Sequence, residues 1–239
     1  AVSTAKSYLT GDVKKVLLRL NSGMYKNAFT CGIPGSSHVG NIYAAALGAV
    51  AGRPEKGLES LADVTEADNA AAERMVAAGM VEAKMTEITS RIFIEATVTT
   101  ESGEAVVTIR DSHTNIVRIT VNGETVLSKE EETAGEAETK PLIHSYTLEQ
   151  IYEYIDTVDV EEIRFIGDAF RMNYELFEEG LNSPRTTYAR YLLKKNGGEI
   201  ISKDEQKTAS LLCNAAIEAR VIGLDKPAMS ITGSGAHGI

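Results

Sequence analysis

The spacing of apolar residues changes once along this chain, and that change most constrains how the chain can fold. From Val81 onward, apolar and polar residues alternate with a period of two, which is typical of strands with one buried face. The alternation predicts four or five strands, in the segments 82–86, 91–99, 104–111, 116–121 and 125–128. Glu101-Ser102-Gly103 and Asn122-Gly123 supply the hairpin turns between them. The middle of the chain therefore predicts an antiparallel sheet.

Segments with helical spacing lie on both sides of this block. The first part of the chain contains an expected strand at 14–20, a short extended piece at 29–33, a buried apolar helix at 39–50, and helices at 55–63 and 65–78. After Pro141 we expect helices at 147–157, 159–180, 183–195 and 202–222. Strands gathered in one block with helices on both sides predict an α+β fold rather than alternating βαβ units.

Three regions follow from this pattern. Residues 1–80 form an N-terminal strand and helix segment, residues 81–140 a sheet region, and residues 141–239 a helical region. Residues 129–140 are acidic and lack apolar periodicity, so we place a solvated connection there. The glycine-rich end at 233–239 resembles a turn that leads into a further element, and we expect the helical region to be truncated there.

Charge and hydropathy limit the classes of partner that we expect this chain to bind. The formal net charge of −10 would repel nucleic acid and anionic membranes, so we expect neither as a partner and favour a small ligand. No run of about 18 apolar residues and no leader-like N-terminus is present, so we expect a cytoplasmic protein. Cys31 and Cys213 are far apart in sequence, and we expect two reduced, mostly buried thiols rather than a disulfide framework or a zinc site.

The segment Ile33-Pro34-Gly35-Ser36-Ser37-His38-Val39-Gly40 carries the strongest chemical signal. Pro34 and Gly35 predict a turn, and Ser36 or Ser37 is expected to cap the helix that follows. The free N–H groups of that helix, together with the two hydroxyls, would also suit a carboxylate. His38 has two interpretations, a neutral general base or an imidazole held by local hydrogen bonds.

Two other polar clusters are candidates. His113-Thr114-Asn115 lies between two expected strands and fits either a simple turn or a pocket wall. Gly233-Ser234-Gly235 would allow a ligand to approach the backbone closely. It does not stand between a strand and a helix as a dinucleotide-binding motif does, so we reject a dinucleotide site.

Several motifs, taken in order, resemble one known family. They are Lys26-Asn27-Ala28-Phe29, Gly32-Ile33-Pro34-Gly35, Val39-Gly40, Ala44-Ala45-Ala46-Leu47-Gly48-Ala49, Gly57-Leu58-Glu59, His113-Thr114-Asn115-Ile116-Val117, Arg164-Phe165-Ile166, Glu179-Gly180-Leu181 and the segment 230–239. Across nearly the whole chain this pattern resembles the L-cysteine desulfidase family, which is related to the iron–sulfur L-serine dehydratase alpha chain.

The resemblance implies a lyase. It implies β-elimination from a small L-amino acid, giving pyruvate and ammonia, plus sulfide from cysteine, with a [4Fe–4S] cluster and without pyridoxal phosphate. His38 would be the base, and Ser36 and Ser37 would bind the carboxylate. The remaining residues expected to contact the substrate are Asn27, Gly35, His113, Asn115, Ser234 and Gly235.

This sequence departs from the family at the cluster ligands. A cysteine-threonine-glutamate-proline motif and further cluster cysteines of the family have no counterpart here, and Cys31 and Cys213 do not match their positions. Ala236-His237 stands where the family usually has asparagine-glutamine. We therefore expect no metal ligands and no cluster within these residues. The alternative is a non-catalytic amino-acid-binding fragment, or a subunit that needs a partner chain. A homo-oligomer is also compatible with the sequence.

Overall fold

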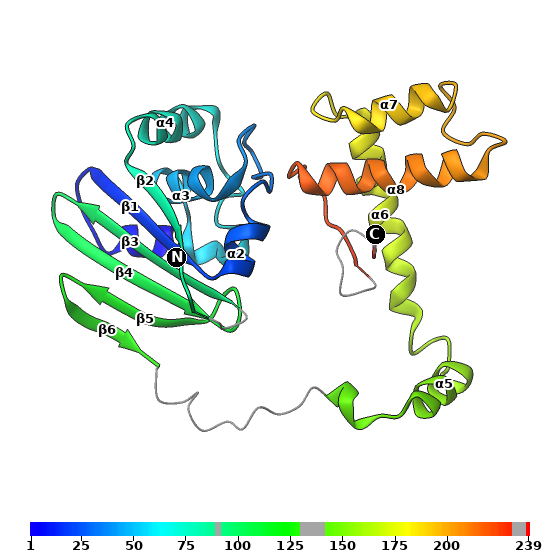
Figure 1. Cartoon of the computed structure of the whole chain (residues 1–239), viewed down its shortest axis with the longest axis horizontal. Helices are drawn as coiled ribbons and strands as arrows, with labels where there is room; N and C mark the ends of the chain where they lie inside the picture. The colour runs from blue at the N-terminus through cyan, green and yellow to red at the C-terminus, as the bar shows by residue number, and fades with distance from the viewer. Residues whose placement is uncertain (89–91, 130–141, 231–237) are drawn as a thin grey trace. The chain divides into compact units, whose positions relative to one another are not determined.

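The computed structural model describes residues 1–88, 92–129, 142–230 and 238–239 (Figure 1). The chain divides into two compact units, which we describe separately. The first comprises Ala1–Glu130 with Ile222–Asp225, and the second comprises Glu131–Val221 with Lys226–Ile239. Among the described residues, no helix combines the length and apolar character needed to cross a bilayer.

A six-stranded sheet forms the centre of the first unit, with strand order β2-β1-β3-β4-β5-β6. The strands are β1 (Val13–Leu20), β2 (Val81–Met85), β3 (Phe93–Thr100), β4 (Gly103–Arg110), β5 (Ile116–Val121) and β6 (Glu124–Ser128). Each strand lies within two or three residues of a predicted segment, because alternation and turn residues are local signals. The α+β class is confirmed.

The sheet is mixed, so the expectation of a wholly antiparallel sheet is wrong. β1 pairs in parallel with β2 and antiparallel with β3, with Val16 opposite both Val81 and Val98. A strand from the expected 1–80 region thus lies inside the sheet of the expected 81–140 region. The two regions consequently belong to one compact unit, because β1 forms hydrogen bonds to strands that follow residue 80.

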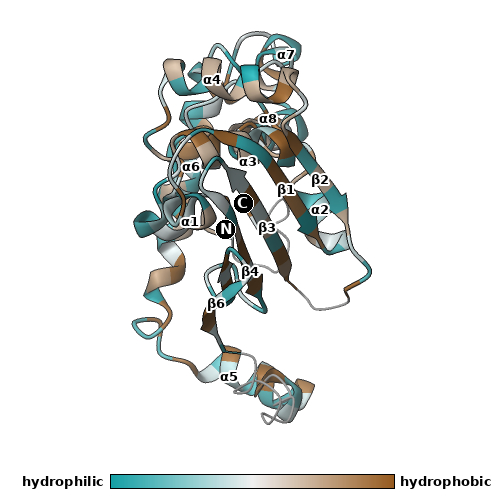
Figure 2. Ribbon diagram, turned by 90° about the vertical axis from the view of Figure 1, so that its left-hand side faces the viewer, coloured by the Kyte–Doolittle hydropathy of each residue, from teal (hydrophilic) through white to brown (hydrophobic). Residues whose placement is uncertain are grey.

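Two helices cover one face of this sheet. They are α1 (Val2–Ser7) and α3 (Gly40–Val50), and α3 is largely buried, as its apolar sequence predicts. Val16, Val98 and Val107 point from the sheet into the same core as Leu47 of α3. Figure 2 shows apolar residues along β3 and β4. Burial of this apolar area is the main favourable contribution to folding of the unit.

Shorter helices complete the first unit. They are α2 (Ser22–Asn27), the 3₁₀ segment η1 (Pro54–Glu59) and α4 (Glu66–Ala77). The helix expected at 55–63 is reduced to η1, where Gly57 adopts a positive φ of 59° and interrupts the helical path. α4 starts as predicted, because the Thr65 hydroxyl and the Asp68 carboxylate form a reciprocal capping box. These hydrogen bonds from Thr65 lower the pKa of Asp68.

The second unit is helical, as expected. Its elements are η2 (Leu142–Ser145), α5 (Leu148–Thr157), η3 (Arg164–Gly167), α6 (Asp168–Asn182), α7 (Tyr188–Lys195) and α8 (Glu205–Val221). Thr147 is the N-cap of α5 and forms a capping box with Gln150, which confirms the predicted start of that helix.

Two helices begin later than predicted. α6 starts at Asp168 rather than Asp159, because the Asp159 carboxylate accepts a hydrogen bond from the Glu161 N–H and holds a local turn. α7 starts at Tyr188 rather than at Ser183, since Ser183 makes a similar turn. In both cases a side chain that resembles a helix cap stabilises a separate turn upstream of the helix.

The α6–α8 crossing brings two backbones close together. A Cβ added at Gly180 would lie within 2.1 Å of the Ala215 carbonyl oxygen, so only glycine fits there. Leu176 on α6 and Leu211 on α8 are fully buried in this unit. The second unit therefore has an apolar core of its own.

Glu218 on α8 caps the start of α7. Its carboxylate accepts hydrogen bonds from the N–H groups of Thr187, Tyr188 and Ala189 at 2.7–3.0 Å. Burial alone would raise the pKa of Glu218, but these hydrogen bonds outweigh it and the pKa is lowered. A carboxylate from one helix thus satisfies the free N–H groups at the start of another.

This cap predicts a pH-dependent contribution to stability. The pKa of Glu218 is lower in the folded chain than in the unfolded chain. The stability that its carboxylate contributes is therefore fully present above the ordinary pKa of a glutamate, and it is lost as the pH falls through the lowered pKa of the folded chain. We expect Glu218→Gln to lower the free energy of unfolding by about 1 kcal/mol at neutral pH. The difference from the unsubstituted protein should shrink in acid. Urea unfolding at pH 7 and pH 3 measures both, with exposed Glu178→Gln as the control. A difference that does not change with pH would contradict the prediction.

Candidate functional site

Residues 32–39 form a closed loop directly before α3. Gly32 and Val39 form an antiparallel bridge, and the Gly40 N–H donates to the Cys31 carbonyl oxygen at 3.0 Å. The extended piece expected at 29–33 is confined to this single bridge. These two contacts close the loop at its base and hold its residues next to the start of α3. We call it the serine loop.

A turn at Pro34 and Gly35 sets the shape of the serine loop. The Ser36 N–H donates to the Ile33 carbonyl oxygen at 3.1 Å, with proline and a positive-φ glycine (71°) between them. This pattern matches a type II turn, so the predicted turn is confirmed. Space also requires glycine here, because a Cβ on Gly35 would lie 2.9 Å from the Val64 carbonyl oxygen.

Neither Ser36 nor Ser37 caps α3, so that prediction is wrong. The N-cap residue is instead Val39, which has an extended backbone and gives no side-chain hydrogen bond. The Ser36 hydroxyl oxygen instead accepts a hydrogen bond from the His38 N–H at 3.1 Å, and Ser36 is buried. Ser37 is exposed, and no described residue forms a hydrogen bond with its hydroxyl. Ser36 therefore shapes the serine loop, whereas Ser37 is available to a ligand.

His38 is held on two sides. Its Nε2 atom lies 2.7 Å from Oε1 of Glu73 on α4, and its ring stacks on Tyr43 of α3 with centroids 4.0 Å apart. The two ring planes differ by 5°, and the His38 side chain is 22% exposed. A neutral imidazole that donates from Nε2 to a carboxylate keeps its lone pair on Nδ1. The arrangement therefore fixes one tautomer and orients a basic nitrogen.

Asn69 links the serine loop to α4. Its Nδ2 atom donates to the carbonyl oxygens of Gly35 and Thr65, both at 2.9 Å. Its Oδ1 atom is buried, and it alone among the buried side-chain polar atoms of the described residues has no hydrogen-bond partner. Buried acceptors are normally satisfied, so this oxygen is suited to a donor that the chain itself does not supply.

The other predicted residues lie in two places. Asn27, at the end of α2, and His113 line one open pocket of about 520 Å³ with Asp111 and Ser112. The Asn27 carbonyl oxygen accepts a hydrogen bond from the Cys31 thiol at 2.7 Å, which ties the end of α2 to the base of the serine loop. Asn115 instead holds the β4–β5 turn, donating to the Arg110 carbonyl oxygen at 3.2 Å. Ser234 and Gly235 lie outside the described residues.

Sequence reasoning missed Tyr43, Asn69 and Glu73. Asn69 and Glu73 are four residues apart on α4 and therefore share one face of that helix. This spacing shows that the two side chains are neighbours, but it gives no indication that His38 lies opposite them. Only the packing of α3 and α4 brings the three polar groups together.

The cysteines offer no cluster site. Cys31 is in the first unit and Cys213 in the second, and both are free and exposed, so the expectation of buried thiols is wrong. In the described ranges, no three His, Cys, Asp or Glu side chains are grouped as metal ligands would be. A [4Fe–4S] cluster needs three or four such ligands, so these residues do not fit one.

The chain is similar to a set of bacterial proteins. It is 35% identical over 243 residues to a UPF0597 protein of Dichelobacter nodosus, covering the whole chain and 55% of that relative. UPF0597 proteins of Clostridium botulinum strain Okra and Shewanella oneidensis are 35% and 34% identical, with 57% of each covered. The chain thus spans about half the length of these relatives. No protein-family model matches it, and neither does any solved structure.

Gly40, at the base of the serine loop, is predicted to be sensitive to substitution. Gly40 has a φ of 93°, and a Cβ there would lie 2.4 Å from the Phe29 carbonyl oxygen. Gly79 has a similar φ of 69° but open space around it. We expect Gly79→Ala to cost about 1 kcal/mol of stability and Gly40→Ala about 3 kcal/mol, measured by urea unfolding. Equal losses would mean that the close approach at Gly40 carries no cost.

The contact with Glu73 predicts the tautomer of His38. In ¹⁵N NMR spectra of the neutral imidazole we expect the proton on Nε2, because Glu73 accepts it. Glu73→Ala should abolish the preference, whereas Glu73→Gln should retain it through the amide oxygen. Glu66→Ala on the same helix is the control. A proton on Nδ1 in the unsubstituted chain would contradict the geometry.

Proposed function

We propose that the chain is part of a lyase of the L-serine dehydratase or L-cysteine desulfidase type. The reaction is β-elimination from a small L-amino acid, which gives pyruvate and ammonia, and also sulfide when the substrate is cysteine. The pairing of His38 with Glu73 beside the serine loop is the observation that carries this proposal. A cytoplasmic location, a small amino-acid ligand and self-association belong to the same proposal.

His38 is suited to remove the α-proton. Elimination starts when a base takes this proton from Cα; the electron pair then forms the Cα–Cβ double bond, and the thiolate or hydroxide leaves from Cβ. The aminoacrylate that results hydrolyses to pyruvate and ammonia. With Nε2 donating to Glu73, the free Nδ1 is the atom that would accept the proton, and the Glu73 carboxylate would stabilise the imidazolium that forms.

The serine loop is suited to bind the charged ends of an amino acid. The exposed Ser37 hydroxyl is free to donate to a carboxylate. The unpartnered Asn69 Oδ1 would accept a hydrogen bond from an α-ammonium group once the loop admits it. Asn27 and His113 provide further polar contacts from a pocket whose α2 wall is tied to the same loop. We assign Ser36 and Gly35 to shaping the loop rather than to direct contact.

The iron–sulfur cluster that the family resemblance implies does not fit the residues described. The two cysteines of the chain are fewer than such a cluster needs. We therefore derive no step through a cluster. If the proposed enzyme uses one, residues beyond these 239 or a partner chain must hold it.

The same cysteine count supports a second candidate function. A binding-only protein, or a subunit that is completed by a partner chain, would need the serine loop without any cluster ligands of its own. Anaerobic purification of the full-length protein distinguishes these cases. Pyruvate formed from serine or cysteine supports a complete lyase, and activity that requires an added chain supports the subunit. Amino-acid binding with no pyruvate under either condition would contradict the lyase proposal.

Loss of the proposed general base, His38, should lower kcat more than it weakens substrate binding. We expect His38→Asn in the full-length protein to reduce kcat for pyruvate formation by about 100-fold or more with a small change in KM, because a positioned general base contributes about 10²–10⁴ in rate. Exposed His144→Asn in the second unit is the matched control and should retain activity. Near-normal kcat in the His38 variant would assign His38 to a structural role.

A further inference from the structure

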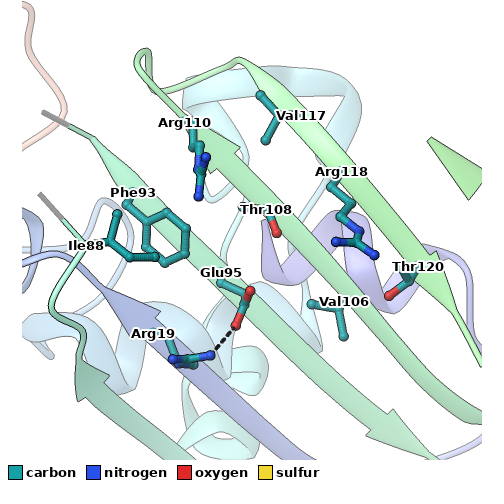
Figure 3. Close-up of a pocket in the computed structure, with 10 residues that line it drawn as sticks. All are labelled: Arg19, Ile88, Phe93, Glu95, Val106, Thr108, Arg110, Val117, Arg118 and Thr120. Carbon is teal, nitrogen blue, oxygen red and sulfur yellow. Dashed lines mark hydrogen bonds and ion pairs between the residues drawn. The ribbon is translucent and has the colours of Figure 1, made fainter. Parts of the chain in front are cut away.

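The sheet has a second polar site on the face opposite α1 and α3. Alternate residues of β1, β3, β4 and β5 point to this face, and their side chains enclose a pocket of about 230 Å³ (Figure 3). The lining residues are Arg19, Ile88, Phe93, Glu95, Val106, Thr108, Arg110, Val117, Arg118 and Thr120. We call it the sheet pocket. It shares no residue with the serine loop.

Arg110 presents a guanidinium group at the edge of the pocket. The group lies over the ring of buried Phe93, with 5.5 Å between Cζ and the ring centroid. Among the described residues, no carboxylate forms an ion pair with Arg110. Stacking on an aromatic ring leaves the N–H edge of a guanidinium free to bind an oxyanion in a bidentate manner.

Thr108 places a hydroxyl in the same pocket. Thr108 is only 8% exposed, yet no residue in the described ranges forms a hydrogen bond with its side chain. Figure 3 shows its oxygen between Glu95 and Arg118, on the pocket side of β4. Because this hydroxyl faces the cavity and no described side chain uses its hydrogen-bonding capacity, it is available to a ligand.

A strand irregularity directs further side chains into the pocket. The register of β4 and β5 shifts between Thr108 and Ile109, which face Arg118 and Ile116, so Val117 is the extra residue of a β-bulge. Val117 and Arg118, although consecutive, therefore both line the pocket. Bulges of this kind commonly re-aim side chains next to binding sites.

The charge of the sheet pocket is opposite to that of the chain. Three guanidinium groups and one carboxylate line it, a net charge of plus two, whereas the whole chain carries −10. Glu95 is neutralised by Arg19, with 3.1 Å between Oε1 and Nη1. The potential at the pocket therefore favours an anion despite the acidity of the protein.

We propose that the sheet pocket binds a small oxyanion, either a carboxylate or a phosphate group. Arg110 holds two of its oxygens and the Thr108 hydroxyl donates to it, while Arg118 adds positive charge. Val106 and Ile88 provide an apolar wall for the rest of the ligand. The volume is below the range of about 300–1,000 Å³ typical of drug-sized ligands, so the ligand is a small metabolite rather than a nucleotide or a peptide.

NMR titration of the 239-residue chain tests the site. Sodium acetate, sodium benzoate and sodium phosphate are added separately at constant ionic strength, and the signals of the Thr108 amide and the Arg110 side-chain N–H are followed. We expect a saturable shift with at least one of the three. Tighter binding of benzoate than of acetate identifies a carboxylate with an apolar body, and tighter binding of phosphate identifies a phosphate ligand.

Two variants test whether the NMR shift arises from binding in the sheet pocket. Arg110→Gln should weaken binding at least about tenfold, as expected for loss of charge-assisted hydrogen bonds, and Thr108→Val should weaken it about threefold or more without changing side-chain shape. Arg220→Gln, an exposed arginine on α8 without a partner in the described ranges, is the control. Linear shifts with all three anions would overturn the proposal. Binding that both pocket variants leave unchanged would also overturn it.

Discussion

The double pairing of β1 is the constraint on which the first unit depends. This strand bonds in parallel to β2 and antiparallel to β3, so residues 65 to 87 positions apart in the chain become neighbours. Its inward side chains meet α1 and α3, and this contact buries α3. The serine loop enters α3 directly, so its position is fixed by the same packing. The sheet pocket lies on the opposite face of the same strands. The positions of both candidate sites therefore depend on this one sheet.

The presence or absence of a hydrogen-bond partner distinguishes structural from functional polar groups in this molecule. The capping boxes at Thr65 and Thr147 and the Glu218 carboxylate all satisfy N–H groups at helix starts. By contrast, Asn69 Oδ1 is buried without a partner, and the Thr108 hydroxyl faces the sheet pocket with no hydrogen-bond partner in the part of the chain that the structure describes. Each lies beside a group that can bind or move charge, His38 or Arg110. Polar atoms without a hydrogen-bond partner therefore mark the two places where this chain is suited to meet a ligand.

Predictions from local patterns were largely correct. Alternation located all six strands, and Thr65, Thr147 and the Pro34-Gly35 turn were identified from a few adjacent residues. The same reasoning failed where a side chain had two local options. Ser36 bonds the His38 N–H instead of capping α3, and Asp159 holds a turn instead of starting α6. Capping and turn formation use the same short polar side chains, so spacing alone does not separate them.

The sequence by itself determined the α+β class, the strand block and the residues of the serine loop, because these depend on contacts between residues close in the chain. The tertiary structure decided that β1 joins the sheet in a mixed arrangement and that Glu73 and Tyr43 hold His38. It also decided that Arg110, Thr108 and Phe93 share a pocket. These partners come from separate segments, and strand register and helix packing bring them together. Burial of apolar area determines that packing. No short-range sequence pattern predicts which polar groups the packing brings together.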